Sequence, residues 1–254
     1  MDTKEYETSF KVEEKYWWFV GQKFLVEKFL NQFYSINSEN EIKKKSSKKF
    51  SFLDVGCGTG ITLSLLSQYG TAQGIDVADQ AVYFCRQRGF KITKSDAMNI
   101  QFPKEIFDAV TVLGVFYHKG VTDDLQGFKE IFRVLKPGGR IFFLDCATPS
   151  LYGKHDLAFH GIRRYTKPEL QAKLEKAGFA VERITYYNTL FFPLVWLKRN
   201  LEKLSKAPPK SEVSEEMNPI LNKILTNIYC AELSLLKYTS FPIGINILAV
   251  ARKK

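Results

Sequence analysis

The sequence predicts an α/β fold built on a doubly wound, mostly parallel sheet of seven strands. Short apolar runs alternate along the chain with segments of helical periodicity, which is typical of a sheet covered by helices on both faces. The apolar run 50–55 is followed by glycines at alternate positions, Gly56, Gly58 and Gly60, and then by the helical segment 61–68. Glycines at such a turn let a ligand lie against bare backbone at a helix N-terminus.

The remaining elements follow in order. Residues 10–34 carry aromatic and charged residues at helical spacing and predict one or two helices before the sheet, followed by a polar linker at 37–49. Apolar runs predict further strands at 72–77, 90–93, 107–115, 140–144, 181–187 and 244–251. Helices are expected between them at 79–88, 123–135, which should end at the Lys-Pro-Gly-Gly sequence 136–139, and 168–176.

A long insertion separates the last two expected strands. Residues 188–242 exceed the length of a plain connection and predict two helices, 189–206 and 219–237. We therefore expect a single domain over 1–254. Its parts are a helical cap and linker at 1–49, a core at 50–187 and 243–254, and the helical insertion at 188–242.

Composition limits the class of protein. A chain of 254 residues can bury one sizeable core, and its 21 Phe and 12 Tyr favour bulky packing or an apolar pocket. The net charge of +10 is partly held by the lysine run in 43–49, which we interpret as a solvated loop. Four scattered cysteines favour a reducing cytoplasm and no bound metal. The apolar run 190–197 is too short to span a bilayer, which needs about 20 residues, so at most peripheral membrane contact is expected.

The glycine turn excludes two common nucleotide sites. A dinucleotide turn would need a third glycine where Ile61 or Leu63 stands, and a phosphate-binding loop would need a lysine directly after Gly60. What remains is Asp-x-Gly-x-Gly-x-Gly beginning at Asp54. An acid at this place suits a ligand with a cationic end.

Five motifs in order resemble the class I S-adenosylmethionine-dependent methyltransferases, in particular the small-molecule branch called methyltransferase type 11 or 12. The motifs lie at 54–60, 74–76, 95–97, 107–110 and 130–139. The resemblance covers about residues 50–145 and implies a Rossmann-like core with S-adenosylmethionine as the cofactor. Five motifs at the right spacing are far more specific than one glycine turn.

The resemblance also implies which residues bind the cofactor. Asp76 ends the second strand 22 residues after Asp54, where an acid that bonds the ribose hydroxyls is expected. Asp79 is expected to cap the following helix, and Asp96 to accept the adenine amine. The expected cofactor-binding residues are Asp54, Gly56, Cys57, Gly58, Gly60, Asp76, Val77, Asp96, Ala97, Leu113 and Trp18.

The aromatic sequence 16–19 near the N-terminus has two interpretations. Together with 163–166 and 188–193 it resembles one subgroup of bacterial methyltransferases, and its residues Trp17, Trp18 and Phe19 either close over a ligand as a lid or simply pack on the domain. In many relatives an arginine closely follows the tryptophan pair, but this chain has Gly-Gln-Lys at 21–23.

Methyl transfer needs alignment of the acceptor, and a general base only where the acceptor loses a proton. His118 follows the fourth strand, and the expected loop 152–165 faces the same crevice. We expect catalytic roles for His118, His160 and Tyr117, and contacts with the acceptor from His155, Arg163, Arg164 and Tyr165. The competing interpretation is that the histidines are ordinary loop residues and that the arginines form a solvated cationic loop.

The acceptor is expected to be a small or amphiphilic molecule methylated at oxygen or nitrogen. Enzymes that methylate base amines resemble one another in an Asp/Asn-Pro-Pro-Tyr/Phe turn after the fourth strand, and those that methylate cytosine at C5 share a Pro-Cys pair. Residues 113–118 contain neither, so nucleic acid is disfavoured as a partner. A non-catalytic scaffold and an RNA methyltransferase remain alternatives.

The helix expected at 189–206 carries apolar residues together with Lys198, Arg199, Lys203 and Lys206. It could lie on an anionic membrane, cover the pocket or form a dimer face, and burial within the domain competes with all three. The oligomeric state is left open between monomer and homodimer.

Overall fold

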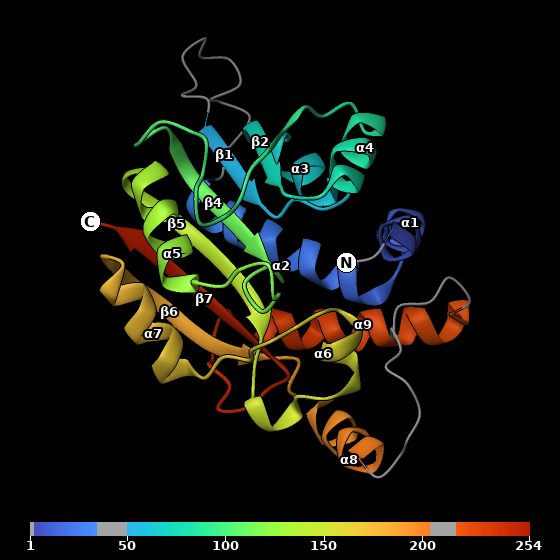
Figure 1. Cartoon of the computed structure of the whole chain (residues 1–254). Coiled ribbons are helices and arrows are strands. Elements are labelled where there is room, and N and C mark those ends of the chain that lie inside the picture. Colours follow the sequence, from blue (N-terminus) through green and yellow to red (C-terminus); the bar gives the residue numbers. More distant parts are fainter. Residues whose placement is uncertain (1–2, 35–49, 204–216) are drawn as a thin grey trace, which may run out of the picture.

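The computed structural model describes residues 3–34, 50–203 and 217–254. They form one seven-stranded sheet in the order β3-β2-β1-β4-β5-β7-β6 (Figure 1). The pairings among β1 to β5 are parallel, whereas β7 runs antiparallel to both β5 and β6. The sheet is therefore mostly parallel, as predicted, with one antiparallel strand that the sequence pattern did not reveal.

The strands are β1 (Phe50–Val55), β2 (Gly70–Asp76), β3 (Ile92–Lys94), β4 (Phe107–Leu113), β5 (Leu135–Cys146), β6 (Phe179–Tyr187) and β7 (Asn246–Lys253). Strand β5 begins five residues before the predicted strand at 140. Leu135 already pairs with Phe107, and the register then shifts before Ala109 pairs with Arg140. The sequence 136–139 therefore lies inside the strand as an irregularity, with Gly138 at a φ of 79°.

The helices are α1 (Thr3–Val12), α2 (Trp17–Tyr34), α3 (Ile61–Leu66), α4 (Asp79–Gln87), α5 (Asp124–Val134), α6 (Lys154–Ala158), α7 (Lys167–Lys176), α8 (Phe192–Lys203) and α9 (Pro219–Leu235). Two expectations need correction. The expected loop 152–165 contains α6. Asp79 is the first residue of α4 rather than its cap: Ala78 holds the capping position, and the Asp79 carboxylate pairs with the Lys94 ammonium at 2.6 Å. The predicted linker and its lysine run fall within 35–49, outside the described residues.

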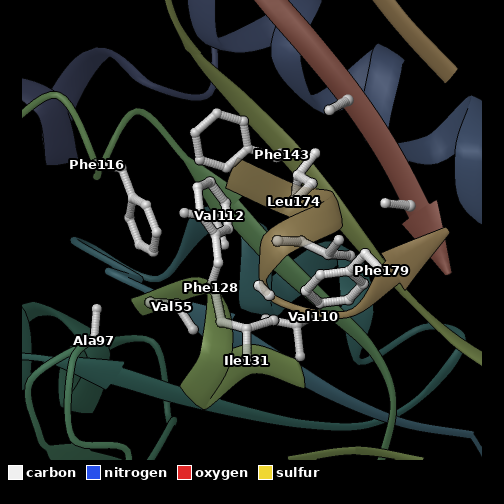
Figure 2. Packing of buried hydrophobic residues seen from close by; sticks show 14 of the residues in the cluster. Val55, Ala97, Val110, Val112, Phe116, Phe128, Ile131, Phe143, Leu174 and Phe179 are labelled. Atoms are coloured by element: carbon white, nitrogen blue, oxygen red, sulfur yellow. The ribbon is translucent and has the colours of Figure 1, made fainter. Parts of the chain in front are cut away.

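Two apolar layers cover the two faces of the sheet, because successive side chains of a strand point to opposite sides. One layer joins strand residues such as Val110 and Val112 to Phe128 and Ile131 of α5 and Leu174 of α7 (Figure 2). The other layer joins Phe52, Phe142 and Leu248 to the apolar sides of α2 and α9. The central strands are thus buried on both sides and hold their carboxyl ends rigidly in place.

The helical cap and the helical insertion pack against each other. Helices α2 and α9 lie side by side, with the Trp18 ring stacked on the Tyr229 ring at 5.6 Å between centroids. A Cβ added to Gly21 would lie 2.1 Å from the Tyr229 ring, so only glycine permits this close approach of α2 and α9. Within the described ranges, no helix is long and apolar enough to cross a membrane.

Candidate active site

One cavity of about 630 Å³ lies at the carboxyl ends of the parallel strands. The turn after β1 and the ends of β2 and β4 form one part of its wall. Residues from α1, α2 and the start of α8 form the opposite part, including Trp17, Trp18 and Phe19. The predicted aromatic cap therefore borders the cavity, and it also packs on α9. The packing interpretation of 16–19 is therefore confirmed, whereas closure over a ligand stays a prediction.

The glycine turn presents its backbone to this cavity. Gly56 and Gly58 have φ values of 68° and 52°, in the region that favours glycine. A Cβ on Gly56 would come within 2.5 Å of Val115, whereas one on Gly58 would meet no atom within 4 Å. Gly60 does not line the cavity. It lies directly before α3 with a φ of 86°, and a Cβ there would lie 3.0 Å from the Cys85 sulfur. The turn therefore leaves a bare backbone face at Gly58, whereas glycine at position 56 permits the close approach of Val115.

Asp76 joins the turn to the end of β2. One carboxylate oxygen accepts the N–H of Gly58 at 3.0 Å and the other accepts the N–H of Ala78 at 3.0 Å. Burial raises the pKa of Asp76, and these bonds oppose the shift. Each carboxylate oxygen has two lone pairs, so both can accept a further hydrogen bond from a ligand in the cavity.

Two more of the expected acids also line the cavity. Asp96 accepts the N–H of Met98 at 2.8 Å, which fixes the turn after β3. Asp54 accepts the hydroxyl of Thr111 at 2.6 Å, and burial raises its pKa to about 7 although that hydrogen bond opposes the shift. A cation placed beside Asp54 would favour its ionised form.

Glu13 is a residue of the site that sequence reasoning missed. It follows α1, is buried, and lines the cavity. Its carboxylate accepts a short hydrogen bond from the Thr59 hydroxyl and pairs with the Arg88 guanidinium at 2.6 Å. Arg88 also donates to the carbonyl of Thr59 at 3.1 Å. This network attaches the cap directly to the glycine turn. Glu13 is one of several acids in the N-terminal segment, and its sequence position gave no signal of this role.

His118 and Tyr117 border the cavity after β4, as predicted. Burial lowers the pKa of His118 to about 4, with smaller contributions from His160 and Lys119, so the imidazole is neutral near pH 7. Burial also raises the pKa of Tyr117 well above its usual value, so its phenol keeps its proton. The two rings lie 4.9 Å apart.

Asp145, at the end of β5, is a second residue that the sequence analysis did not select. It accepts the N–H groups of Phe116, Tyr117 and Cys146 at 2.9, 3.2 and 2.7 Å. It thereby holds the segment that carries His118, and it lines the cavity itself. Burial raises its pKa to about 7. Its position at a strand end, shared with Asp54 and Asp76, was the signal available in the sequence.

Three predicted residues are not brought to the cavity. The Tyr165 hydroxyl donates to Asp124 at 2.7 Å, and Arg163 lies 3.5 Å from the same carboxylate while donating to the carbonyl of Phe116. His160 is in the left-handed region at a φ of 53°, and its carbonyl accepts the N–H of Lys119. These residues build the wall behind the cavity instead of facing it.

Arg164 and His155 do line the cavity. The Arg164 guanidinium is buried and pairs with the buried carboxylate of Asp156 at 2.8 Å, while also donating to the carbonyl of Ala147. The interpretation of 163–164 as a solvated cationic loop is therefore wrong. Arg164 joins α6 to the end of β5, which fixes this side of the cavity.

The insertion adds polar groups to the same end. Asn188 is held at a φ of 62° after β6, and its side-chain nitrogen lies 3.4 Å from the Asn246 oxygen. Its own side-chain oxygen is buried without a hydrogen-bond partner among the described residues. Arg199 of α8 is buried at the cavity wall and pairs with Glu202 at 2.9 Å. A buried acceptor at Asn188 suits a hydrogen-bond donor on a bound molecule.

Comparison with known proteins identifies the core. Residues 53–143 match the family described as a methyltransferase domain. Residues 53–143 therefore form the core of a class I S-adenosylmethionine-dependent methyltransferase domain. Its sheet order, glycine turn and cavity agree with that assignment, and so the predicted family and cofactor are confirmed. The bare backbone at Gly58 and the free lone pairs of Asp76 fit this cofactor.

Relatives of this methyltransferase domain differ in what their names describe. A demethylmenaquinone methyltransferase from Lactobacillus johnsonii is 31% identical over 139 residues, which is 48% of this chain and 56% of the relative. A probable tRNA methyltransferase 9B from Mus musculus is 37% identical over 89 residues, which is 35% of this chain and 20% of the relative. The chain thus spans about half the length of the first relative and a fifth of the second.

Solved structures agree on the fold. An S-adenosylmethionine-dependent methyltransferase from Archaeoglobus fulgidus superposes with a TM-score of 0.56 over 91% of this chain and 94% of its own, at 20% identity. At that identity the likeness describes the fold alone. It extends well beyond residues 53–143 and so includes much of the cap and insertion regions.

Proposed function

We propose that this chain transfers a methyl group from S-adenosylmethionine to an oxygen or nitrogen atom of a small or amphiphilic acceptor. The observation that carries the proposal is a single cavity lined by two chemically different groups of residues. One group is the glycine turn with Asp54, Asp76 and Asp96, and the other is the aromatic and polar side chains around His118. Donor and acceptor would therefore meet inside the same cavity.

The donor end follows from charge and backbone shape. Asp76 offers lone pairs to a ribose, Asp96 to an adenine amine, and Asp54 a charge for the methionine ammonium. We further assign Val77, Ala97, Leu113 and Trp18, which all line the cavity, to contacts with the cofactor. When bound, S-adenosylmethionine supplies a methyl group already activated as a sulfonium. The protein then has to hold the acceptor in line with it.

At the acceptor end, His118 and Tyr117 orient the reacting group. Neutral His118 can accept a hydrogen bond from an acceptor hydroxyl or amine, while the Tyr117 phenol can donate one. A pKa of about 4 makes His118 a weak base, so its contribution is alignment rather than removal of a tightly held proton. Catalysis should then show no ionisation of His118 between pH 5.5 and 8.

A ring carbon is the second candidate for the methylated atom. It is favoured by a relative from Geotalea daltonii, 30% identical over 139 residues, which is named a ubiquinone/menaquinone biosynthesis C-methyltransferase. A quinol would still be an amphiphile, with a polar ring at the His118 end and an apolar tail toward the aromatic cap. Methylation at carbon would need the ring, and not its hydroxyl, in line with the methyl group.

The proposal is tested with labelled methyl groups. The full chain is incubated with S-adenosylmethionine carrying a radioactive methyl and with 4-octylphenol, octylamine or a short-chain demethylmenaquinol, and label extracted into organic solvent is counted. We expect label in at least one amphiphile, reduced about 10- to 100-fold in His118→Ala and unchanged in Lys119→Ala, a neighbouring exposed residue. Cofactor binding by calorimetry without label in any of them would favour a non-catalytic scaffold.

A further inference from the structure

Helix α8 has two faces with different surroundings, because one lines the cavity and the other is exposed. Val195 and Arg199, four residues apart, line the cavity together with Phe191 just before the helix. Leu194, Leu197 and Leu201 follow the spacing of the other face and are 68%, 52% and 58% exposed. The expectation that this helix is buried within the domain is therefore wrong for its outer face. Leu194 belongs to both surfaces, because it lines the cavity as well.

Helix α9 carries a second exposed apolar stripe. Ile220, Ile224 and Ile228 recur every four residues, and all three are exposed. Trp17 contacts both segments: its ring lies 5.5 Å from the Phe191 ring, and its backbone N–H donates to the side-chain oxygen of Asn222 of α9 at 2.9 Å. Thr189 and Leu190, just before α8, donate their N–H groups to Glu232, so the start of α8 lies beside the C-terminal part of α9. We use the term apolar face for the exposed residues Leu194, Leu197 and Leu201 of α8 and Ile220, Ile224 and Ile228 of α9.

Basic residues outnumber acidic ones beside this apolar face. The only carboxylates in the two helices are Glu202 and Glu232. Glu202 pairs with Arg199 at 2.9 Å, lies 3.8 Å from the Lys198 ammonium and lines a shallow groove with Leu197 and Leu201. Glu232 is buried, where it accepts the N–H groups of Thr189 and Leu190. The exposed charges of both helices are lysines, namely Lys198, Lys203 and Lys223.

We propose that the apolar face docks on an anionic lipid bilayer and that an amphiphilic acceptor enters the cavity from the bilayer past Leu194. Exposed apolar side chains flanked by an excess of basic residues match the interface of a membrane with anionic headgroups. A second copy of this chain is a poorer occupant, because a two-fold contact would oppose lysines to lysines. The entry of an acceptor rests on the proposed function, whereas the docking itself does not.

Sedimentation with vesicles tests the docking. The full chain, without cofactor or acceptor, is mixed with phosphatidylcholine vesicles or with vesicles containing about a third phosphatidylglycerol. We expect binding to the anionic vesicles and a fall of about 10-fold or more in affinity for both Leu197→Ser/Leu201→Ser and Lys198→Glu/Lys203→Glu. The fluorescence of the exposed Trp196 should shift to the blue on binding.

Matched controls lie on the opposite part of the molecule. Tyr83→Ser removes an equally exposed apolar side chain from α4, and Lys129→Glu reverses an exposed lysine on α5. Neither should change vesicle binding. Thermal melting and calorimetry with S-adenosylmethionine should show that every variant is folded and still binds cofactor.

Three results would overturn the proposal. The first is that the wild-type chain remains in the supernatant with anionic vesicles, and the second is that it binds vesicles irrespective of lipid charge. The third is that light scattering shows a dimer that Leu197→Ser/Leu201→Ser dissociates. The last result would assign the apolar face to a second copy. If vesicles bind as expected but no amphiphile is methylated, the proposed function fails while the docking stands.

Discussion

The carboxylates at the strand ends are the residues on which this site depends. Asp54, Asp76 and Asp96 come from three separate strand ends, and they line one cavity because parallel strands bring their carboxyl ends to one edge. Each is held by a specific partner, which is Thr111 for Asp54, the backbone of Gly58 for Asp76 and that of Met98 for Asp96. Their carboxyl groups are therefore held in position before any ligand arrives.

The first prediction concerns Asp76. Replacing Asp76 by Asn should weaken binding of S-adenosylmethionine about 10- to 100-fold, because a hydrogen bond to a charged group contributes about 1.5–3 kcal/mol. Isothermal calorimetry measures the change. Asp79→Asn, three residues on and exposed, serves as the control and should bind like the wild type. Equal affinities for the Asp76 variant and the wild type would disprove the ribose assignment.

The second prediction concerns the buried carboxyl of Asp54. Its pKa of about 7 lies above the unfolded value of about 3.9, so folding favours the protonated form. Its contribution to stability is full below about pH 4 and is lost as pH rises through about 7. The cofactor-free chain should therefore unfold more easily in urea at pH 8 than at pH 5.5, and Asp54→Asn should reduce that difference by on the order of 1–2 kcal/mol. An identical pH dependence in the variant would contradict the assignment.

At the scale of elements, the cap is tied to the cofactor turn by one buried ion pair. Glu13 and Arg88 connect the end of α1 to the end of α4, and Thr59 of the glycine turn bonds to both. Burial raises the pKa of Glu13, which the Thr59 and Arg88 bonds oppose. Movement of the cap away from the cavity would break this network.

The third prediction concerns removal of the Glu13–Arg88 ion pair. Arg88→Met leaves the Glu13 carboxylate buried without its cation, and breaking a buried pair costs about 3–5 kcal/mol. We expect faster amide hydrogen exchange in residues 3–34 and about 10-fold weaker cofactor binding. Arg86→Met, exposed on the same helix, is the matched control. Unchanged exchange in 3–34 would show that the cap is held by its apolar contacts alone.

For the whole molecule, the net charge of +10 invites the idea of a nucleic-acid partner. The cavity argues against it, since the aromatic cap and buried groups such as Asn188 line its wall. The match to the tRNA methyltransferase relative covers only 35% of this chain. The proposed docking on an anionic bilayer would give the lysines beside the apolar face another role.

The fourth prediction concerns binding of nucleic acid. Transfer RNA should not shift on a gel at about 1 μM protein and 150 mM salt, because non-specific affinities are about 10⁻⁴–10⁻⁶ M under such conditions. Any shift at 50 mM salt should disappear at 200 mM and should not respond to S-adenosylmethionine. A salt-resistant shift that the cofactor strengthens would restore the RNA methyltransferase alternative.

The sequence alone determined the fold class, the strands of the core, the glycine turn and the acids Asp54, Asp76 and Asp96. These are local signals, because strand ends, turns and helix stops are written in residues close together in the chain. It could not distinguish Gly60, which starts a helix, from Gly56 and Gly58, which face the cavity.

Only the tertiary structure decided which polar residues of the 152–165 segment face the cavity. His155 and Arg164 do, whereas Arg163 and Tyr165 bind Asp124. It also revealed Glu13, whose partners Thr59 and Arg88 lie 46 and 75 residues away. Such contacts depend on how distant elements pack, and a side chain's direction follows from that packing rather than from its neighbours in sequence. The exposure of the outer face of α8 likewise depends on how the helices pack, and only the tertiary structure showed it.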